Sequence, residues 1–189
     1  MPSRTQIVCL HEGEKGRSID PLFIRTLIKA LDPSWIRPWP GNNVIRPVDC
    51  GGRKALIARM PVELKQCLAA GAKTTLMVWA DVDDDMEGPE ALKREFWNKA
   101  QEAGITPEQF DQVVFVFAKD RIENWVQFLE TGSTDESIEG PRVKHDRQAS
   151  DAAKKLASLC LSGGAIQAIP ESLEWSCRNW RALKARIND

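Results

Sequence analysis

This chain of 189 residues has almost no excess of either charge: 26 lysine and arginine residues face 27 aspartate and glutamate residues, for a formal net charge of −1. Proteins that bind nucleic acid through bulk electrostatics carry a strong positive excess, so any contact with nucleic acid here must use a local basic patch. Histidine is scarce as well. Because His11 and His145 are far apart in the sequence, we expect neither a catalytic triad nor a zinc site from them.

Long apolar runs are also missing. No stretch approaches the roughly 20 residues of a membrane span, and the N-terminus lacks the apolar core of a signal peptide. The five cysteines are odd in number, widely spread and without a Cys-x-x-Cys pair. We therefore expect no disulfide or zinc framework, buried free thiols, and a soluble cytoplasmic protein that makes no membrane contact.

What the sequence does contain is an alternation of short β-like and longer helical apolar patterns, which predicts an α/β fold with a mostly parallel sheet flanked by helices. With 42% apolar residues, the chain can bury one full core. We expect a core over residues 1–130, and a segment 131–189 that adds a polar surface loop and two helices packed on that core. The expected strands are 5–10, 44–50, 74–80 and 110–118; the expected helices are 18–31, 51–71 with Pro61 as a point of interruption, 88–104, 120–130, 149–161 and 172–187.

Acidic residues follow three of the expected strands. "HEGE" follows the first strand, "DVDDD" the third and "KDRIE" the fourth. Sites in open α/β sheets form at the carboxyl ends of parallel strands, so Glu12, Asp81 and Asp83 are expected to meet there. Carboxylates are the ligands that Mg²⁺ prefers. Asp81 and Asp83 lie two apart and should point the same way in extended backbone, whereas Asp84 should point away.

Four motifs, "IVCLHEGE", "GGRKAL", "LMVWADVD" and "VFVFAKDRIENWV", resemble in this order the Toprim domain, especially its small stand-alone forms related to overcoming-lysogenization-defect (OLD) nucleases. The resemblance covers roughly residues 5–130 and implies a Rossmann-like sheet with Mg²⁺- or Mn²⁺-dependent cleavage of DNA or RNA phosphodiesters. By position, Glu12 matches the metal-binding or acid–base glutamate. Asp81 and Asp83 match the metal-binding pair, and Glu123 matches a further glutamate of OLD-like members.

The resemblance implies more than the reaction. Related proteins often work in antiphage defence beside an ATPase partner, and the sequence allows a homo-oligomer. Toprim domains often carry a second acidic residue after the Glu-Gly pair, and both Glu14 and Asp20 are candidates. Asp20 is also a good helix cap, which is the favoured interpretation. Likewise, Glu123 would suit the positive end of a helix dipole.

Basic residues lie beside these acids. Lys119 and Arg121 flank the fourth strand's end, and Arg53 with Lys54 follows a Gly-Gly pair whose amides could cradle a phosphate. We take these four side chains as candidate ligands of substrate phosphates. For Lys119 and Arg121, solvated surface charge is the slightly favoured interpretation. A tight turn alone would explain the two glycines equally well.

Two other functions remain open. "DVDDD" resembles the Asp-x-Asp of haloacid-dehalogenase-like phosphatases, but that family has its aspartates on the first strand, and here they follow the third. The chain could also be a non-catalytic or partner-activated subunit that keeps the fold and acts only in a complex. A metal-dependent nuclease is the leading hypothesis.

Overall fold

The computed structural model describes residues 6–13, 18–31, 45–72, 74–83, 85–162 and 169–188, which contain one parallel four-stranded sheet. The strand order is β2-β1-β3-β4, and every neighbouring pair is parallel. This confirms the predicted α/β class and gives a Rossmann-like arrangement. The strands are β1 (Gln6–His11), β2 (Ile45–Asp49), β3 (Thr74–Val82) and β4 (Val114–Lys119); the helices are α1 (Asp20–Leu31), α2 (Arg53–Ala70), α3 (Pro89–Glu102), α4 (Pro107–Phe110), α5 (Ile122–Thr131), α6 (Asp146–Ser162) and α7 (Glu171–Asn188).

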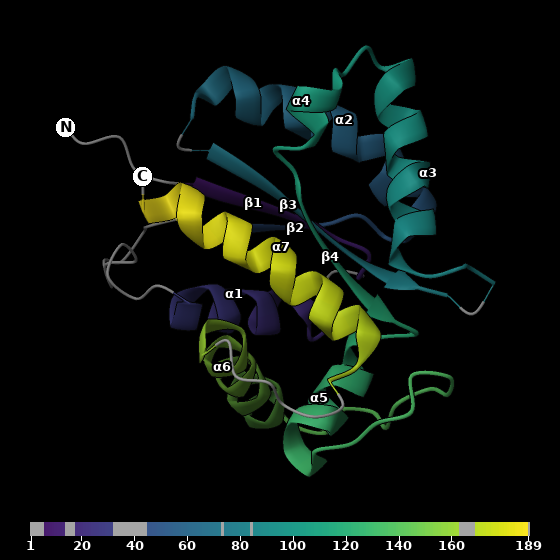
Figure 1. Ribbon diagram of the computed structural model, residues 1–189, viewed down its shortest axis with the longest axis vertical. Coiled ribbons are helices and arrows are strands. Elements are labelled where there is room, and N and C mark those ends of the chain that lie inside the picture. Colours follow the sequence, from purple (N-terminus) through teal and green to yellow (C-terminus); the bar gives the residue numbers. More distant parts are fainter. Residues whose placement is uncertain are drawn as a thin grey trace.

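Helices cover both faces of the sheet (Figure 1). Because successive side chains of a strand point to opposite faces, β1 sends Val8 and Leu10 into a core formed with α2 and α3, and Ile7 and Cys9 into a core formed with α1, α5 and α6. Both cores consist of buried apolar side chains. The residues at the strand ends are therefore held by a tightly packed sheet.

Local signals explain most of the helices. In α1, the fully buried Phe23, Ile24, Leu27 and Ile28 recur at helical spacing and face the sheet. The expectation that Pro61 interrupts the second helix is wrong, because α2 continues through this residue. Pro61 is buried, and the packing of this helix on the sheet compensates for the backbone hydrogen bond that proline cannot donate.

The fourth strand is shorter than expected. Residues up to Phe110 belong to α4, and β4 begins only at Val114. A capping box decides this boundary: Thr106 Oγ1 accepts from the Gln109 N–H at 3.3 Å, and Gln109 Oε1 accepts from the Thr106 N–H at 3.0 Å. These local bonds outweigh the β-like composition of 110–113.

Helix α7 lies along β4, which is an edge strand of the sheet. Ser176 Oγ accepts a hydrogen bond from the Phe117 N–H and donates one to the Phe117 carbonyl, both at 3.1 Å. Asn179 Nδ2 donates to the Phe115 carbonyl at 2.9 Å. Side chains of α7 thus satisfy backbone groups that an edge strand would otherwise leave unpaired.

One expectation about the cysteines is wrong. Cys160 of α6 and Cys177 of α7 form a disulfide, with their Cα atoms 5.5 Å apart, whereas Cys9, Cys50 and Cys67 are free. The two partners are 17 residues apart, and only the packing of α6 beside α7 brings them together. The sequence spacing contained no sign of this pairing.

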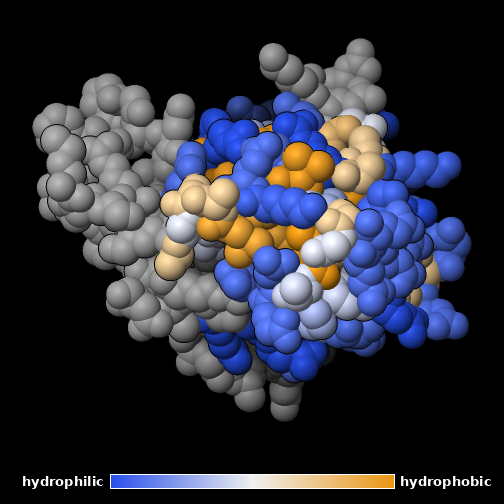
Figure 2. Space-filling model, turned by 90° about the horizontal axis from the view of Figure 1, so that it is seen from above, coloured by the Kyte–Doolittle hydropathy of each residue, from blue (hydrophilic) through white to orange (hydrophobic). Residues whose placement is uncertain are grey.

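The outer face of the α2, α3 and α4 layer is mainly hydrophilic, with apolar atoms showing between the charged side chains (Figure 2). A hollow of about 260 Å³ lies over α3 and α4; its lining is Glu90, Lys93, Arg94, Trp97, Pro107, Phe110 and Asp111. None of these residues follows the carboxyl end of a strand. Across the part of the chain that the structure describes, no helix has the length and apolar character that crossing a membrane requires.

Candidate functional site

A cleft of about 580 Å³ opens at the carboxyl ends of β1, β3 and β4, which are neighbours in the sheet. Four of the acids named as candidates from the sequence, Glu12, Asp20, Asp81 and Glu123, lie in it. Arg121 does as well. The complete lining is Glu12, Gly13, Ser18, Ile19, Asp20, Asp81, Arg121, Ile122, Glu123, Arg142 and Val143.

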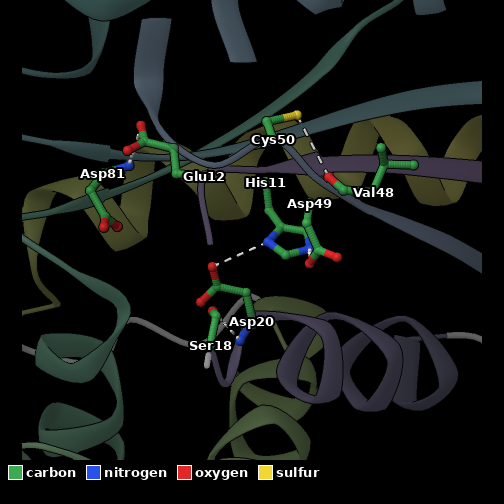
Figure 3. A network of polar contacts seen from close by, with 8 residues as sticks. All are labelled: His11, Glu12, Ser18, Asp20, Val48, Asp49, Cys50 and Asp81. Atoms are coloured by element: carbon green, nitrogen blue, oxygen red, sulfur yellow. Dashed lines mark hydrogen bonds and ion pairs between the residues drawn. The ribbon is translucent and has the colours of Figure 1, made fainter. Parts of the chain in front are cut away.

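The side chain of Glu12 contacts the backbone of Asp81. The Asp81 N–H donates to Glu12 Oε1 at 3.3 Å, which joins the residue after β1 to the carboxyl end of β3 (Figure 3). Burial raises the pKa of Glu12 to about 7, although the Asp81 hydrogen bond opposes this, and the nearby charges of Asp83 and Asp20 raise it further. Glu12 is therefore a carboxyl group that exchanges its proton near neutral pH.

The other acids of the cleft are also hard to ionise. Burial raises the pKa of Asp81 well above its usual range, and the charges of Asp20, Glu12 and Glu123 add to the effect. Burial likewise raises the pKa of Glu123, against its own backbone hydrogen bond and the charge of Arg121. Each of these carboxylates is less stable as an anion than it would be in water, and a bound cation would relieve that cost.

Asp20 is the acid that the sequence-based interpretation undervalued. It is the first residue of α1, and its carboxylate faces the cleft side of the helix start, close to His11 (Figure 3). Its backbone N–H is already satisfied by Ser18 Oγ at 3.1 Å. The sequence did signal this residue, because it follows the Glu-Gly pair at short range, but the same pattern also predicted a helix cap.

Asp83 lies outside the cleft, although alternation along a strand placed it beside Asp81. Strand β3 ends at Val82, and beyond that point Asp83 Oδ2 pairs with Arg53 Nη1 at 2.7 Å. Its side chain is 56% exposed. The Asp-x-Asp pair is therefore split: Asp81 faces the acidic cleft, and Asp83 faces the start of α2. Two further acids of the sequence hypothesis, Glu14 and Asp84, lie outside the described residues.

The basic candidates are divided in the same way. Arg121 lines the cleft and forms ion pairs with Glu139 and, at 3.9 Å, with Asp120. Lys119 ends β4 and is half-buried, but it does not line the cleft, and neither do Arg53 and exposed Lys54 at the start of α2. Arg53 and Lys54 begin α2, whereas Arg121 directly precedes α5.

Arg142 is a second cation in the cleft, and sequence reasoning missed it. It belongs to the segment between α5 and α6, which was expected to be a polar surface loop. Asn124 ties this segment to α5, since its Nδ2 donates to the Ile138 carbonyl at 3.1 Å, and Gly140 packs directly against Asn124. No local pattern marks Arg142, because its position depends on this long-range anchoring.

A tight turn at Asp120 directs the end of β4 into the cleft. Asp120 has a positive φ of 62°, and the Arg121 N–H donates to the Lys119 carbonyl at 2.8 Å. The Asp120 N–H donates to the Val82 carbonyl at 2.9 Å, so the turn is also joined to β3. Non-glycine residues adopt this backbone region at a cost, and aspartate tolerates it better than most. The turn lets α5 begin at the cleft, with Glu123 in its first turn.

Gly13 explains why the acidic residue after β1 is followed by glycine. A Cβ atom at this position would lie 2.5 Å from Ser18 Cβ and 3.0 Å from Asp20 Oδ2. The 2.5 Å distance requires a neighbouring group to move, and the 3.0 Å distance is a tight contact. The absence of a side chain allows the backbone after Glu12 to pack against the residues that start α1.

No model of a known protein family, no curated protein and no solved structure matches this chain.

The donor chemistry of the cleft fits a hard divalent cation. Carboxylate oxygens from Glu12, Asp20 and Asp81 are the ligand type that Mg²⁺ and Mn²⁺ take, and Mg²⁺ commonly uses one or two carboxylates with water and substrate oxygens. Among the described residues, no group of three or more histidine, cysteine, aspartate or glutamate side chains is already placed to hold a metal ion. A cation bound by the carboxylates of this cleft would keep part of its water shell.

Proposed function

We propose that this protein is a Mg²⁺- or Mn²⁺-dependent nuclease of the Toprim type, related to OLD nucleases, that cleaves phosphodiester bonds in DNA or RNA. One observation carries the proposal: acidic residues from separate segments of the chain meet in one cleft, and burial raises the pKa of three of them. The four motifs that resemble the Toprim domain support it, since they lie on β1, α2, β3 and β4 in that order.

The roles of the chain's residues follow from their positions. Asp81, with Glu12 and Asp20 beside it, supplies oxygen ligands for the cation. When bound, the cation activates water and stabilises the charge on the leaving oxygen. Glu12 lies beside Asp81 and is placed to exchange a proton with the attacking water.

Arg121 and Arg142 are the side chains that would bind the scissile phosphate. Both line the cleft, and guanidinium groups recognise phosphate through paired hydrogen bonds. Arg121 is held by Glu139, an exposed acid of the α5–α6 segment, so substrate would compete with this ion pair. Lys119, Arg53 and Lys54 keep no direct part in this proposal because they lie outside the cleft lining.

Two further expectations rest on the resemblance alone. They are a role in cytoplasmic antiphage defence and an ATPase partner protein.

The test is cleavage of single- and double-stranded DNA and RNA by the purified chain with Mg²⁺ or Mn²⁺. We expect Asp81→Asn to lower the rate by about 100-fold or more, the scale of a lost metal ligand. Asp85→Asn is the matched control, since it makes the same change at an exposed acid outside the cleft. Cleavage that persists in Asp81→Asn would refute the proposal. An inert wild-type protein that becomes active with a partner would instead support the subunit hypothesis.

A further inference from the structure

His11 is the last residue of β1, and its side chain is fully buried. Its two ring nitrogens face carboxylates from two other segments: Nδ1 lies 3.5 Å from Asp20 Oδ2, and Nε2 lies 3.0 Å from Asp49 Oδ1 (Figure 3). Among the described residues, neither nitrogen has a hydrogen-bond partner of regular geometry. The two carboxylates are therefore the polar groups that face the imidazole ring. Buried histidine without such partners would carry a large desolvation cost.

The two carboxylates belong to different surroundings. Asp49 ends β2, pairs in register with His11, and does not line the cleft. Asp20 starts α1 and does line it. The imidazole therefore bridges a fixed strand end to an acid of the candidate site.

His11 cannot itself meet the substrate or the cation. It is absent from the cleft lining, and both ring nitrogens are turned toward Asp20 and Asp49. What the ring can control is the direction of the Asp20 carboxylate. This matters at the site, because Asp20 and Asp81 line the same cleft.

We propose that His11 is a positioning residue that holds the Asp20 carboxylate in the cleft by linking it to Asp49, so that Asp20 can serve with Asp81 as a ligand of the divalent cation. The proposal rests on the proposed function. It gives His11 the task that supporting residues commonly have at metal sites, which is to orient a ligand rather than to bind the ion.

Two substitutions of His11 separate this role from simple packing. In His11→Asn the amide nitrogen takes the place of Nδ1 and keeps the contact with Asp20. In His11→Gln it takes the place of Nε2, so the contact with Asp20 is lost. Both variants bury an amide in place of the ring. The readout is the affinity of the full-length protein for Mn²⁺ alone, measured by calorimetry and by the spin-resonance signal of free Mn²⁺.

We expect His11→Gln to weaken Mn²⁺ binding by about 10- to 100-fold and His11→Asn by only about 3-fold, on the scale of lost supporting contacts. Equal losses in the two variants would overturn the proposal, because packing alone would produce them.

A double-mutant cycle adds an independent test. In an Asp20→Asn background the His11→Gln change should have no further effect on affinity, since there is no carboxylate left to position; additive losses would overturn the proposal. If His11→Gln does not fold, Asp49→Asn provides the same cycle, with an expected loss of about 3-fold in the wild-type background only. Wild-type protein that does not bind Mn²⁺ would overturn the proposed function and this inference together. Binding that is lost in Asp81→Asn but unchanged in His11→Gln would overturn this inference alone.

Discussion

The backbone N–H of Asp81 donates a hydrogen bond to Glu12 Oε1 at 3.3 Å, and this contact joins two neighbouring parallel strands at their carboxyl ends. It holds the Glu12 carboxylate over the end of β3, where water is partly excluded. The bond stabilises the charged form of Glu12, yet burial has the larger effect and the pKa rises. The folded protein therefore retains a poorly solvated acid that the unfolded chain would not have.

The first prediction concerns pH. The pKa of Glu12 rises from 4.5 to about 7 on folding, so the folded state holds this proton more tightly than the unfolded state. The stability that this proton supports is fully present below pH 4.5 and is lost as the pH rises toward 7. We expect a loss on the order of 1 to 2 kcal/mol, after allowance for partial exposure.

Urea unfolding from pH 4.5 to 7.5 without divalent cations would measure this effect as the difference between wild type and Glu12→Gln. The variant should lose less stability over this window because it has no proton to release at that position. Glu95→Gln, at an exposed position of α3, is the control and should follow the wild type. Parallel wild-type and Glu12→Gln curves would contradict the prediction.

The second prediction compares the two aspartates of the Asp-x-Asp pair. Asp81 lines the cleft, whereas Asp83 is paired with Arg53. A cation at about 100 times its Kd stabilises a protein by roughly 2.7 kcal/mol, which corresponds to about 5 to 10 °C in Tm for a chain of this size. Mn²⁺ should therefore raise the Tm of wild type and of Asp83→Asn, but not that of Asp81→Asn.

Asp81→Asn should also be more stable than wild type when no cation is present, because it removes a buried charge that repels its neighbours. Thermal melts with and without Mn²⁺ provide both results. If Asp83→Asn abolished the Mn²⁺ response, Asp83 would be a ligand and the division of the pair would be wrong.

The third prediction concerns Gly13. In Gly13→Ala the new Cβ would overlap Ser18 and press on Asp20, so the start of α1 must move away from Glu12. We expect a loss of about 1 to 3 kcal/mol in the free energy of unfolding, as for other overpacked sites, together with weaker Mn²⁺ binding. Chemical unfolding and calorimetric titration would measure the two effects. A Gly13→Ala protein that is destabilised but binds Mn²⁺ normally would separate this glycine from the site.

The fourth prediction concerns the edge of the sheet and also supplies a control for Gly13→Ala. Ser176→Ala leaves the buried N–H and carbonyl of Phe117 without their side-chain partner. The expected cost is about 1 to 3 kcal/mol in unfolding free energy. Arg178→Ala, at an exposed position of the same helix, should change stability by less than about 0.5 kcal/mol.

Because Ser176 lies on α7 and is absent from the cleft lining, its loss should leave Mn²⁺ affinity unchanged. Chemical unfolding of the two α7 variants tests the stability difference directly. Equal stability of Ser176→Ala and wild type would mean that the contact of α7 with β4 does not satisfy the strand edge.

Most strands and helices could be predicted because their signals are local. The apolar run of β3 and the helical spacing in α1 appear within a few residues of the sequence. The predicted start of the fourth strand was wrong. Phe110 and Val113 have β-like character, but the capping box of Thr106 and Gln109 favours a helical turn. Here one set of local preferences competed with another, and the hydrogen bonds decided the outcome.

The sequence by itself determined that acids follow the ends of β1, β3 and β4, since a strand's end is a local property and parallel strands share one edge. Only the tertiary structure decided which side chains enter the cleft. The order β2-β1-β3-β4 places Asp49 beside His11, the packing of α1 brings Asp20 to the site, and the anchored α5–α6 segment adds Arg142. Asp83 turns to Arg53 instead. These outcomes depend on contacts between residues that are far apart in the chain. A short stretch of sequence does not determine the energies of such contacts.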